Sequence, residues 1–500
     1  DKKRFPKGGA NIMPTRRAHI HAPLPPHYKL NGKKAFSLVL GPLFFAACLF
    51  LLDGFEFPVQ AAVGLLLWMC VWWVLLPVPV AVTAFLPIII NAFLDLVPMS
   101  SVTGKYFSEI TILLLGADLL SISWEKCGLD KRLAIRALCV IGPRINQQII
   151  VWFMLATLLS MLLPNAVVCA VMIPIAISML KFVGETDTRQ SRIAAVIMVA
   201  IAWGSGIGGL GTPLGGAMNL VAVDYFEQLT GQEYAYVSWS LHLLPMLAVI
   251  CILNLALIFS IKLDKKTLPG SKDFFLAEYA KLPAMNRDEK IGLFIFCLAP
   301  VLAFLRPLYA SLLPGLKPAY VFLLLGMLVI ITPSCKKERS SLLSWKEAEQ
   351  GVLWGLLFIF AGGTALGAII TDTGAAAAIA GIVSHLNLTG GFITILVFTA
   401  FTVMLAETAS NTAAAAIALP IVISVTQTAE LNPIPYIYIT SAAFNAAYML
   451  PTSIRAIPLG YGLSPGFLFQ HGVNQTVATI FLISVAGWLL MKFWPYFCTI

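Results

Sequence analysis

Three adjacent polar residues, Ser410, Asn411 and Thr412, lie inside a stretch of small apolar residues that continues to Pro420. Polar side chains in strongly apolar sequence are costly in a membrane unless they line a cavity or a binding site. Amide and hydroxyl groups donate hydrogen bonds to a carboxylate, and the positive end of a half-helix adds to the attraction. The triplet therefore predicts a site that holds a small anion without a fixed cation.

A weaker version of this pattern occurs earlier, where Asn165 precedes Pro174 by nine residues, the same spacing as from Asn411 to Pro420. The alanines after Asn411 allow a neighbouring backbone to come close, as a tight helical hairpin requires. Two such segments at matching places in two halves of a chain are typical of transporters with an internal repeat. We therefore expect two re-entrant hairpins that carry these asparagines at their tips.

Two further segments contain residues that do not sustain a regular helix. Five glycines and a proline lie within 204–213, and a second break is expected at 451–455. Unwound backbone at 211–213 and at 451–453 offers carbonyl oxygens for a sodium ion, as discontinuous helices of transporters do. Each hairpin is thus expected to be followed by a broken helix.

The composition indicates a helical protein that crosses the lipid bilayer many times. Of the 500 residues, 59% are apolar and 11% are charged, whereas soluble domains have about a quarter charged residues. The nine cysteines are scattered and form no Cys-x-x-Cys pair, so the sequence indicates neither a zinc site nor a redox centre. No Gly-x-x-x-x-Gly-Lys motif occurs, which argues against an ATP-driven pump.

We expect about eleven spans, each of roughly 20 apolar residues, arranged in two halves. In each half, scaffold spans precede a hairpin, a broken helix and a closing span, which is the pattern of an inverted repeat. The expected parts are a disordered basic tail at 1–34, a first half at 35–261 with its hairpin at 146–182 and its broken helix at 191–223, a linker at 262–290, and a second half at 291–500 with its hairpin at 391–427 and its broken helix at 434–461.

The basic residues predict the orientation. The net charge is +9, and 28 of the 33 Lys and Arg residues lie in segments that this topology places on one side. By the positive-inside rule that side is cytoplasmic, together with the amino terminus, the tail and the linker. We expect a plasma-membrane or bacterial inner-membrane protein, and we do not interpret its basic charge as a sign of nucleic-acid binding.

These motifs resemble those of the divalent anion/sodium symporter family, the INDY-type dicarboxylate transporters. The likeness covers nearly all of the chain after residue 35, and it is most specific between Glu407 and Pro420. The other matching segments are Trp72-Trp73, 79–87, 114–121, 125–132, Gly211-Thr212-Pro213 and Met449-Leu450-Pro451.

The resemblance implies a homodimeric secondary active transporter rather than an enzyme. Each protomer would move its hairpins and broken helices across the bilayer as a rigid body, an elevator, with a di- or tricarboxylate, or sulfate, between the hairpin tips. Sodium would be the coupling ion, and no other cofactor is expected. The candidate substrate-binding residues are Asn165, Ser410, Asn411, Thr412, Thr452, Ser453 and Arg455, and the candidate sodium ligands are Ser160, Asn165, Gly211, Thr212, Ala409, Asn411 and Ser453.

The sequence departs from the family at the first hairpin tip, where Pro164-Asn165-Ala166 replaces Ser-Asn-Thr, and in the second loop, which carries Arg455. An arginine that faces lipid from an otherwise uncharged span is costly. In one interpretation Arg455 pairs with a carbonyl or reaches an interface; in another it grips the anion or replaces a sodium charge. At least the first sodium site is expected to be lost, which leaves sodium-independent anion exchange as the alternative to sodium symport.

Two other classes of membrane protein fit the sequence less well. A membrane-embedded enzyme requires clustered carboxylates with a metal, or a nucleophile beside a base, and the spans contain no such motif. An ion channel does not require two hairpins and two broken helices in each chain. Both classes are therefore disfavoured.

Overall fold

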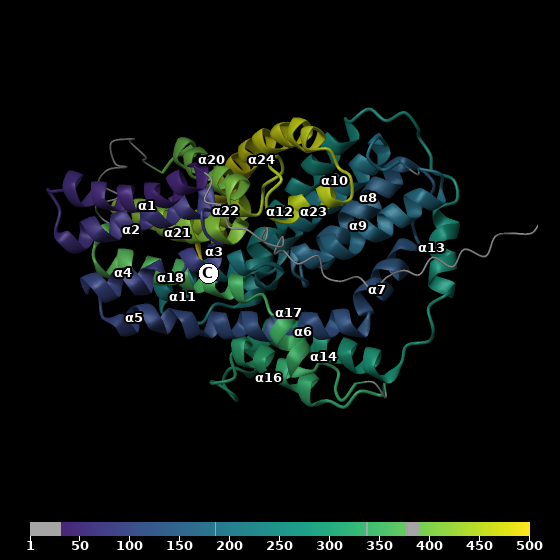
Figure 1. Cartoon of the computed structure of the whole chain (residues 1–500), viewed down its shortest axis with the longest axis horizontal. Helices are drawn as coiled ribbons and strands as arrows, with labels where there is room; N and C mark the ends of the chain where they lie inside the picture. Colours follow the sequence, from purple (N-terminus) through teal and green to yellow (C-terminus); the bar gives the residue numbers. More distant parts are fainter. Residues whose placement is uncertain (1–31, 186, 337–338, 377, 379–389) are drawn as a thin grey trace, which may run out of the picture.

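The computed structural model describes residues 32–185, 187–336, 339–376, 378 and 390–500, which are drawn in colour in Figure 1. Most of these residues are helical, and no β-strand occurs among them. The all-helical fold class expected from the composition is therefore confirmed. The predicted tail at 1–34 lies almost wholly outside the described residues, and the first helix begins at Gly32.

Two long helices and a series of short ones lead into α6. Prolines in the first turns of α2 and α4 help to start these helices, because a first-turn residue has no helical partner for its N–H group. The elements are α1 (Gly32–Leu51), α2 (Phe57–Leu75), α3 (Val80–Thr83), α4 (Leu86–Leu94), α5 (Met99–Thr103), η1 (Gly104–Phe107), α6 (Glu109–Cys127) and α7 (Leu129–Leu138).

A helical hairpin and an interrupted helix follow in the first half. Gly209–Gly211 and Pro213–Gly215 form two short 3-10 turns, η2 and η3, where the glycines and the proline interrupt the helix. The longer elements are α8 (Ile145–Ser160), α9 (Asn165–Phe182), α10 (Arg192–Gly208), α11 (Ala217–Thr230) and α12 (Tyr236–Phe259), followed by α13 (Ser271–Ala280) in the linker.

The second half repeats this order. Its elements are α14 (Arg287–Phe304), α15 (Arg306–Tyr309), α16 (Pro318–Ile331), α17 (Trp345–Gly351), α18 (Trp354–Asp372), α20 (Phe392–Thr408), α21 (Asn411–Thr428), α22 (Pro433–Phe444), η4 (Ser453–Arg455), α23 (Ala456–Gly460), α24 (Pro465–Phe493) and η5 (Pro495–Cys498). The hairpin is α20–α21, and the interrupted helix runs from α22 through η4 to α23. A hairpin followed by an interrupted helix therefore occurs twice.

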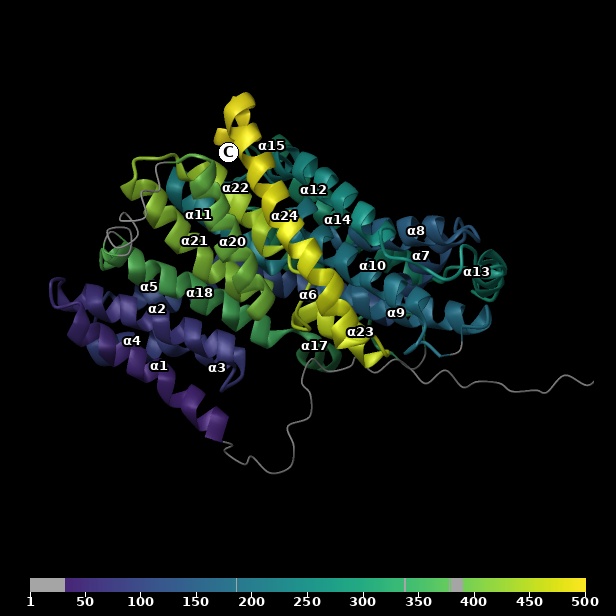
Figure 2. The ribbon, with the colours of Figure 1, turned by 90° about the horizontal axis from the view of Figure 1, so that it is seen from above.

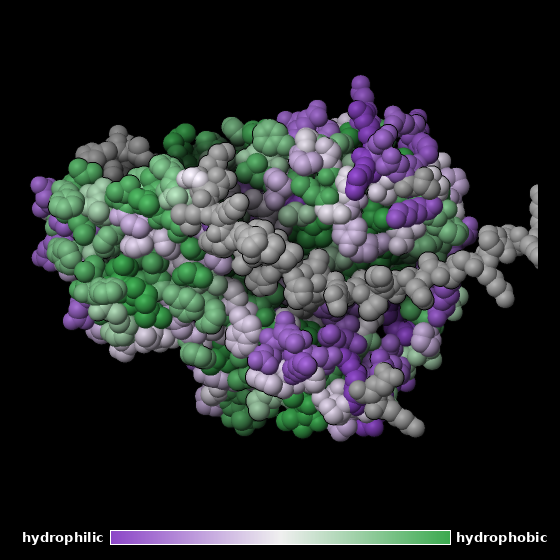
Figure 3. Space-filling model, in the orientation of Figure 1, coloured by the Kyte–Doolittle hydropathy of each residue, from purple (hydrophilic) through white to green (hydrophobic). Residues whose placement is uncertain are grey.

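Several helices are long and apolar enough to cross a bilayer. Among the described residues, nine stretches meet this condition by length and composition, and four shorter apolar helices accompany them. On α1, the side chains of Phe50 and Leu51 are 80% and 78% exposed. Figure 3 shows the hydrophobic surface that covers the end of the molecule where α1, α2 and α4 lie. Apolar surface of this extent suits contact with lipid.

The helices pack in two groups. In the first group, α6 lies along α14 and α16, and α18 packs against α2, α3 and η1. In the second group, the two hairpins and the two interrupted helices pack with α12 and α24. Figure 2 shows α24 running alongside α20 and α22 and crossing toward α12. The hairpins of both halves thus belong to the same packed group.

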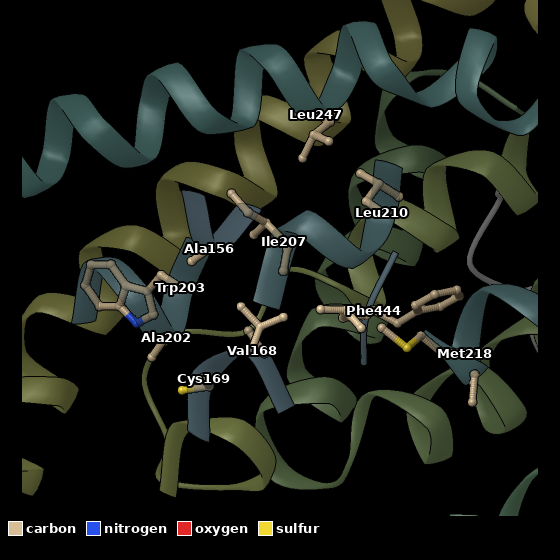
Figure 4. Packing of buried hydrophobic residues seen from close by; sticks show 14 of the residues in the cluster. Ala156, Val168, Cys169, Ala202, Trp203, Ile207, Leu210, Met218, Leu247 and Phe444 are labelled. Atoms are coloured by element: carbon tan, nitrogen blue, oxygen red, sulfur yellow. The ribbon is translucent and has the colours of Figure 1, made fainter. Parts of the chain in front are cut away.

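The core of the second group contains residues from both halves of the chain. Ala156, Val168 and Trp203 from the first half belong to the same buried cluster as Phe444 from α22, and Figure 4 shows part of this cluster. The Trp203 side chain is 1% exposed, and its indole N–H donates to the Tyr448 carbonyl at 3.2 Å. The two repeated units therefore form one core.

The contact between α18 and α21 joins the two groups through small residues. A Cβ atom at Gly363 would collide with the Ala416 side chain, and a Cβ atom at Gly362 would collide with Ala84 of the first group. Residues 413–416 of α21 are all alanine and all buried. Because glycine and alanine have short or absent side chains, the two helices come close together along this contact.

Candidate functional site

Each hairpin turns immediately before an asparagine. Asn165 is the first residue of α9, and Asn411 is the first residue of α21. The Ser410 hydroxyl accepts a hydrogen bond from the Ala413 N–H group at 3.1 Å, which caps the start of α21. The Asn165 Oδ1 atom instead accepts from the neighbouring Ala166 N–H group at 2.9 Å. Both tips therefore present the positive end of a half-helix.

The second tip buries its polar side chains more completely than the first. Asn411 and Thr412 are 6% and 5% exposed, whereas Asn165 is only partly buried. The Oδ1 atom of Asn411 has no hydrogen-bond partner within the described structure. An unpaired buried amide oxygen is costly, and as an acceptor it suits a cation or a donor group rather than a carboxylate. The same amide carries N–H donors for an anion, so the burial of Asn411 and Thr412 at the start of a half-helix makes the triplet the strongest candidate for contact with a ligand.

The first interrupted helix lies against the tip of the first hairpin. The Thr212 hydroxyl donates to the Met161 carbonyl, and the Ser160 hydroxyl donates to the Ser205 carbonyl at 2.7 Å. A Cβ atom at Gly211 would come within 2.7 Å of the Met161 side chain, so the loop approaches the tip closely. Three of the candidate sodium ligands, Ser160, Gly211 and Thr212, are brought together here.

The second interrupted helix meets the second hairpin in the same way. The Thr452 hydroxyl donates to the Glu407 carbonyl at 2.9 Å. Met161 and Glu407 each lie four residues before the tip asparagine, and each accepts a hydrogen bond from a threonine of the following loop. The two units therefore share a structural detail, in addition to the order of their helices.

The Glu407 side chain holds the second loop in place. It is completely buried. Its carboxylate accepts from the N–H groups of Tyr448, Met449 and Leu450, the Met449 and Leu450 bonds being 3.0 Å and 3.0 Å, and from the Thr476 hydroxyl at 2.8 Å. These N–H groups have lost their helical partners because α22 ends at Phe444. The carboxylate thus satisfies the donors that the break in the helix leaves free.

The Arg455 side chain is turned into the same network and is 1% exposed. Its charge lies 3.7 Å from the Glu407 carboxylate. Its nitrogen atoms donate to the carbonyl oxygens of Leu450 (2.7 Å), Ala447 (3.2 Å) and Ala406 (3.1 Å) and to the Thr452 hydroxyl (2.6 Å). Pairing with carbonyl groups was one of the interpretations that the sequence left open, and the structure favours it.

The other two candidates of the second loop differ from each other. The Thr452 hydroxyl both donates to Glu407 and accepts from Arg455, so it is fully engaged. Ser453 is exposed and has a φ of 53°, a left-handed conformation that is rare for a residue other than glycine. Ala409 is buried in an extended conformation at the turn of the hairpin.

A pair of asparagines joins the two interrupted helices and was not identified from the sequence. The Asn445 amide donates to the Asn219 Oδ1 atom at 3.0 Å, and both side chains are almost completely buried. The Asn219 amide in turn donates to the carbonyl oxygens of Gly209 (2.6 Å) and Thr212 (2.9 Å). The position of each asparagine, beside a break in an apolar helix, was the signal that could have revealed the pair.

The structure also shows where the first hairpin reaches the second loop. The Cys169 thiol of α9 lies 3.9 Å from the Ile454 carbonyl of η4. Asn165 itself makes only the bond to its own helix among the hydrogen bonds of the described residues. No group of three or more His, Cys, Asp or Glu side chains that could hold a metal ion occurs in the part of the chain that the structure describes.

Comparisons with known proteins point to one family. The profile of the citrate transporter (CitMHS) family matches residues 70–443. The chain is 29% identical over 451 residues to the sodium-dependent dicarboxylate transporter SdcS of Staphylococcus saprophyticus, which covers 86% of each protein. It is also 29% identical over 459 residues to SdcS of Staphylococcus aureus strain NCTC 8325, covering 87% of this chain and 88% of the relative.

A solved structure shows a similar fold. The crystal structure of the Alcanivorax borkumensis YdaH transporter, described as having an unusual topology, aligns with a TM-score of 0.54 over 88% of this chain and 100% of that one. The two sequences are only 12% identical, so this likeness concerns the fold alone. The match to the family profile spans most of the chain. It includes both hairpin tips, the first loop, and α22 except its last residue. The protein therefore belongs to the citrate transporter family of multi-pass membrane transporters, in agreement with its resemblance to the divalent anion/sodium symporters.

Proposed function

We propose that this protein is a secondary active transporter that carries a di- or tricarboxylate together with sodium. The family is described by citrate transport, and the relatives are named sodium-dependent dicarboxylate transporters. The observation that carries the proposal is the start of α21, where the buried side chains of Asn411 and Thr412 meet the positive end of a half-helix. Amide, hydroxyl and main-chain donors in this arrangement bind a carboxylate.

A substrate with two carboxylates fits a site that has two tips. One carboxylate is bound by Ser410, Asn411 and Thr412, and the other by Asn165 at the start of α9. Ser453 and Thr452 border the site from the second loop, where Ser453 is exposed and available for contact. The loss of both hydroxyls from the first tip leaves most of the hydrogen-bond donors on the second tip.

We place sodium at the first loop, although the changed first tip led to the expectation that the first sodium site is lost. Ser160, Gly211 and Thr212 lie together where the first loop meets the end of α8, and their hydroxyl and carbonyl oxygens are the ligands that sodium takes at broken helices. The second set of candidates, Ala409, Asn411 and Ser453, belongs to the hairpin and loop that also bind the positively charged Arg455 guanidinium through Ala406 and Leu450.

That guanidinium supports an alternative function, sodium-independent anion exchange. The Arg455 side chain donates to three carbonyl oxygens and a hydroxyl, which are the kinds of atoms that would otherwise surround a metal cation. In this alternative, Arg455 replaces a coupling ion and counter-substrate drives transport. A different anion, such as sulfate, is a further variant.

The proposed movement is that of an elevator in a homodimer. The hairpins and interrupted helices, which pack as one group, would move past the group that contains α6, α14, α16 and α18. The small-residue contact between α18 and α21 favours this movement because few side chains interlock there. The amino terminus is proposed to be cytoplasmic in a bacterial inner membrane, which the bacterial relatives and the positive-inside rule both favour.

Uptake of radiolabelled succinate and citrate into proteoliposomes tests the function. One set of vesicles receives an inward sodium gradient, and the other contains unlabelled substrate without sodium. We expect uptake with the sodium gradient and none with potassium in its place. Uptake that requires internal substrate and ignores sodium would establish exchange, and sulfate as a labelled substrate distinguishes the remaining variant. Failure of all three substrates would contradict the proposal.

A further inference from the structure

A cavity outside the candidate transport site lies where α7 meets the end of the linker. Its volume is about 90 Å³, and it is lined by apolar side chains that include Leu129, Leu133, Met285 and Leu293, and by Arg132 and Arg136. The helix α7 packs against the end of α6 and against α13, which can be followed in Figure 1. The cavity is thus lined by apolar side chains and by two cationic groups.

The two arginines have unused hydrogen-bond donors. Arg132 donates through Nη2 to the Pro283 carbonyl at 2.9 Å and pairs with Glu289 at 3.1 Å, but its buried Nε atom has no partner among the described residues. Arg136 is exposed, and its guanidinium has no hydrogen bond or ion pair within the described structure. Glu289 balances one of the two charges, so the cavity keeps a net positive charge.

The helix that supplies both arginines has the character of an interfacial helix. It buries Ala134, Ile135 and Leu138 on one face, and Arg132 and Arg136 lie on another. It directly follows the membrane-spanning helix α6, with Gly128 in a left-handed conformation between them. A basic amphipathic helix at the end of a span lies at the level of the lipid headgroups.

We propose that this cavity binds an anionic phospholipid. The headgroup phosphate accepts hydrogen bonds from the Arg132 Nε atom and from Arg136, and an acyl chain lies along Leu133, Met285 and Leu293. Basic pockets beside membrane-spanning helices bind acidic headgroups in this way, and arginine forms strong charge-assisted bonds to phosphate. The proposal does not depend on which solute the protein carries.

Native mass spectrometry of the purified full chain, with phosphatidylglycerol or phosphatidylcholine added in equal amounts, tests the proposal. We expect the protein to retain phosphatidylglycerol in preference to phosphatidylcholine. In Arg136→Gln, retention of phosphatidylglycerol should fall about tenfold, as expected for the loss of one hydrogen bond to a charged group. Lys131→Gln is the matched control, because it removes the same charge from the same helix without altering the cavity lining.

A second variant tests the apolar part of the site without changing charge. Met285→Trp fills the cavity, and it should reduce retention of phosphatidylglycerol while Arg132 and Arg136 remain. Size-exclusion chromatography verifies that each variant is folded. Equal retention of the two lipids, or equal losses in Arg136→Gln and Lys131→Gln, would overturn the proposal. Soluble glycerol phosphate should not compete; full competition would mean that a free phosphate is bound, and this too would overturn it.

Discussion

The two hairpin–loop units share one hydrogen bond and differ in what surrounds it. In the first unit, Met161 accepts from Thr212 and packs against Gly211. In the second unit, Glu407 accepts from Thr452 and also binds three N–H groups of the loop through its carboxylate. One loop is therefore held by close packing and uncharged hydrogen bonds, including those from Asn219, and the other by charge.

This difference explains why the second loop tolerates a buried arginine. Arg455 has a carboxylate beside it and carbonyl groups on its other sides, so its charge is compensated inside the protein. The first unit has an uncharged thioether at the position of Glu407 and could not compensate an arginine.

The largest expected effect comes from removing the charge that holds the second loop. Glu407→Ala leaves Arg455 buried without its counter-charge and frees three N–H groups, so we expect a loss of about 3–5 kcal/mol in the free energy of unfolding. Thermal unfolding in detergent measures this loss. Glu407→Gln keeps one acceptor and should be less damaging, and Met161→Leu should cost less than about 1.5 kcal/mol. Similar stabilities for Glu407→Ala and Met161→Leu would contradict the contrast between the units.

The next effect concerns the substrate. Because the second tip provides more buried donors, Asn411→Ala should weaken substrate binding by about 1.5–3 kcal/mol, the range for a hydrogen bond to a charged group. The KM for uptake into proteoliposomes measures the change. Asn165→Ala is the comparison from the first tip and should raise KM less. A larger increase in KM for Asn165→Ala than for Asn411→Ala would contradict the prediction that the second tip contributes more to substrate binding.

The close packing of the first loop can be tested by adding one carbon atom. Gly211→Ala places a Cβ atom about 2.7 Å from the Met161 side chain, which is closer than van der Waals contact, so we expect a cost of about 1–3 kcal/mol. Combining it with Met161→Ala should recover part of this cost. Thermal unfolding of both single variants and of the double variant measures the coupling, and strict additivity would refute the proposed contact.

The smallest effect comes from the shared hydrogen bond. Thr212→Val and Thr452→Val each remove one donor, and we expect each to cost about 0.5–1.5 kcal/mol of stability. Thr452→Val should be the more costly of the two, because Thr452 also accepts from Arg455. Unfolding measurements on the two variants under identical conditions test this order. A greater loss in Thr212→Val would show that the charged network does not depend on the hydroxyl.

Local patterns in the sequence predicted where the helices start and break. Both tip asparagines begin a helix, and the first break occurs at the glycines of 208–211. The second break was expected at 451–455, but α22 already ends at Phe444, before Pro451. These local patterns could not predict which residues form hydrogen bonds with one another across the fold. Glu407 binds N–H groups that lie 41 to 43 residues away, and the asparagine pair spans 226 residues. These bonds depend on tertiary packing, so spacing along the chain does not reveal them.

The contact between α18 and α21 has a consequence for how temperature acts on the protein. Glycine and alanine have no side-chain rotamers that become fixed when two surfaces meet. Separation of Gly363 from Ala416, or their meeting again at a new register, therefore releases and consumes no side-chain entropy. In the proposed movement of the hairpins past α18, we therefore expect the resistance of this contact to sliding to change little between low and high temperature.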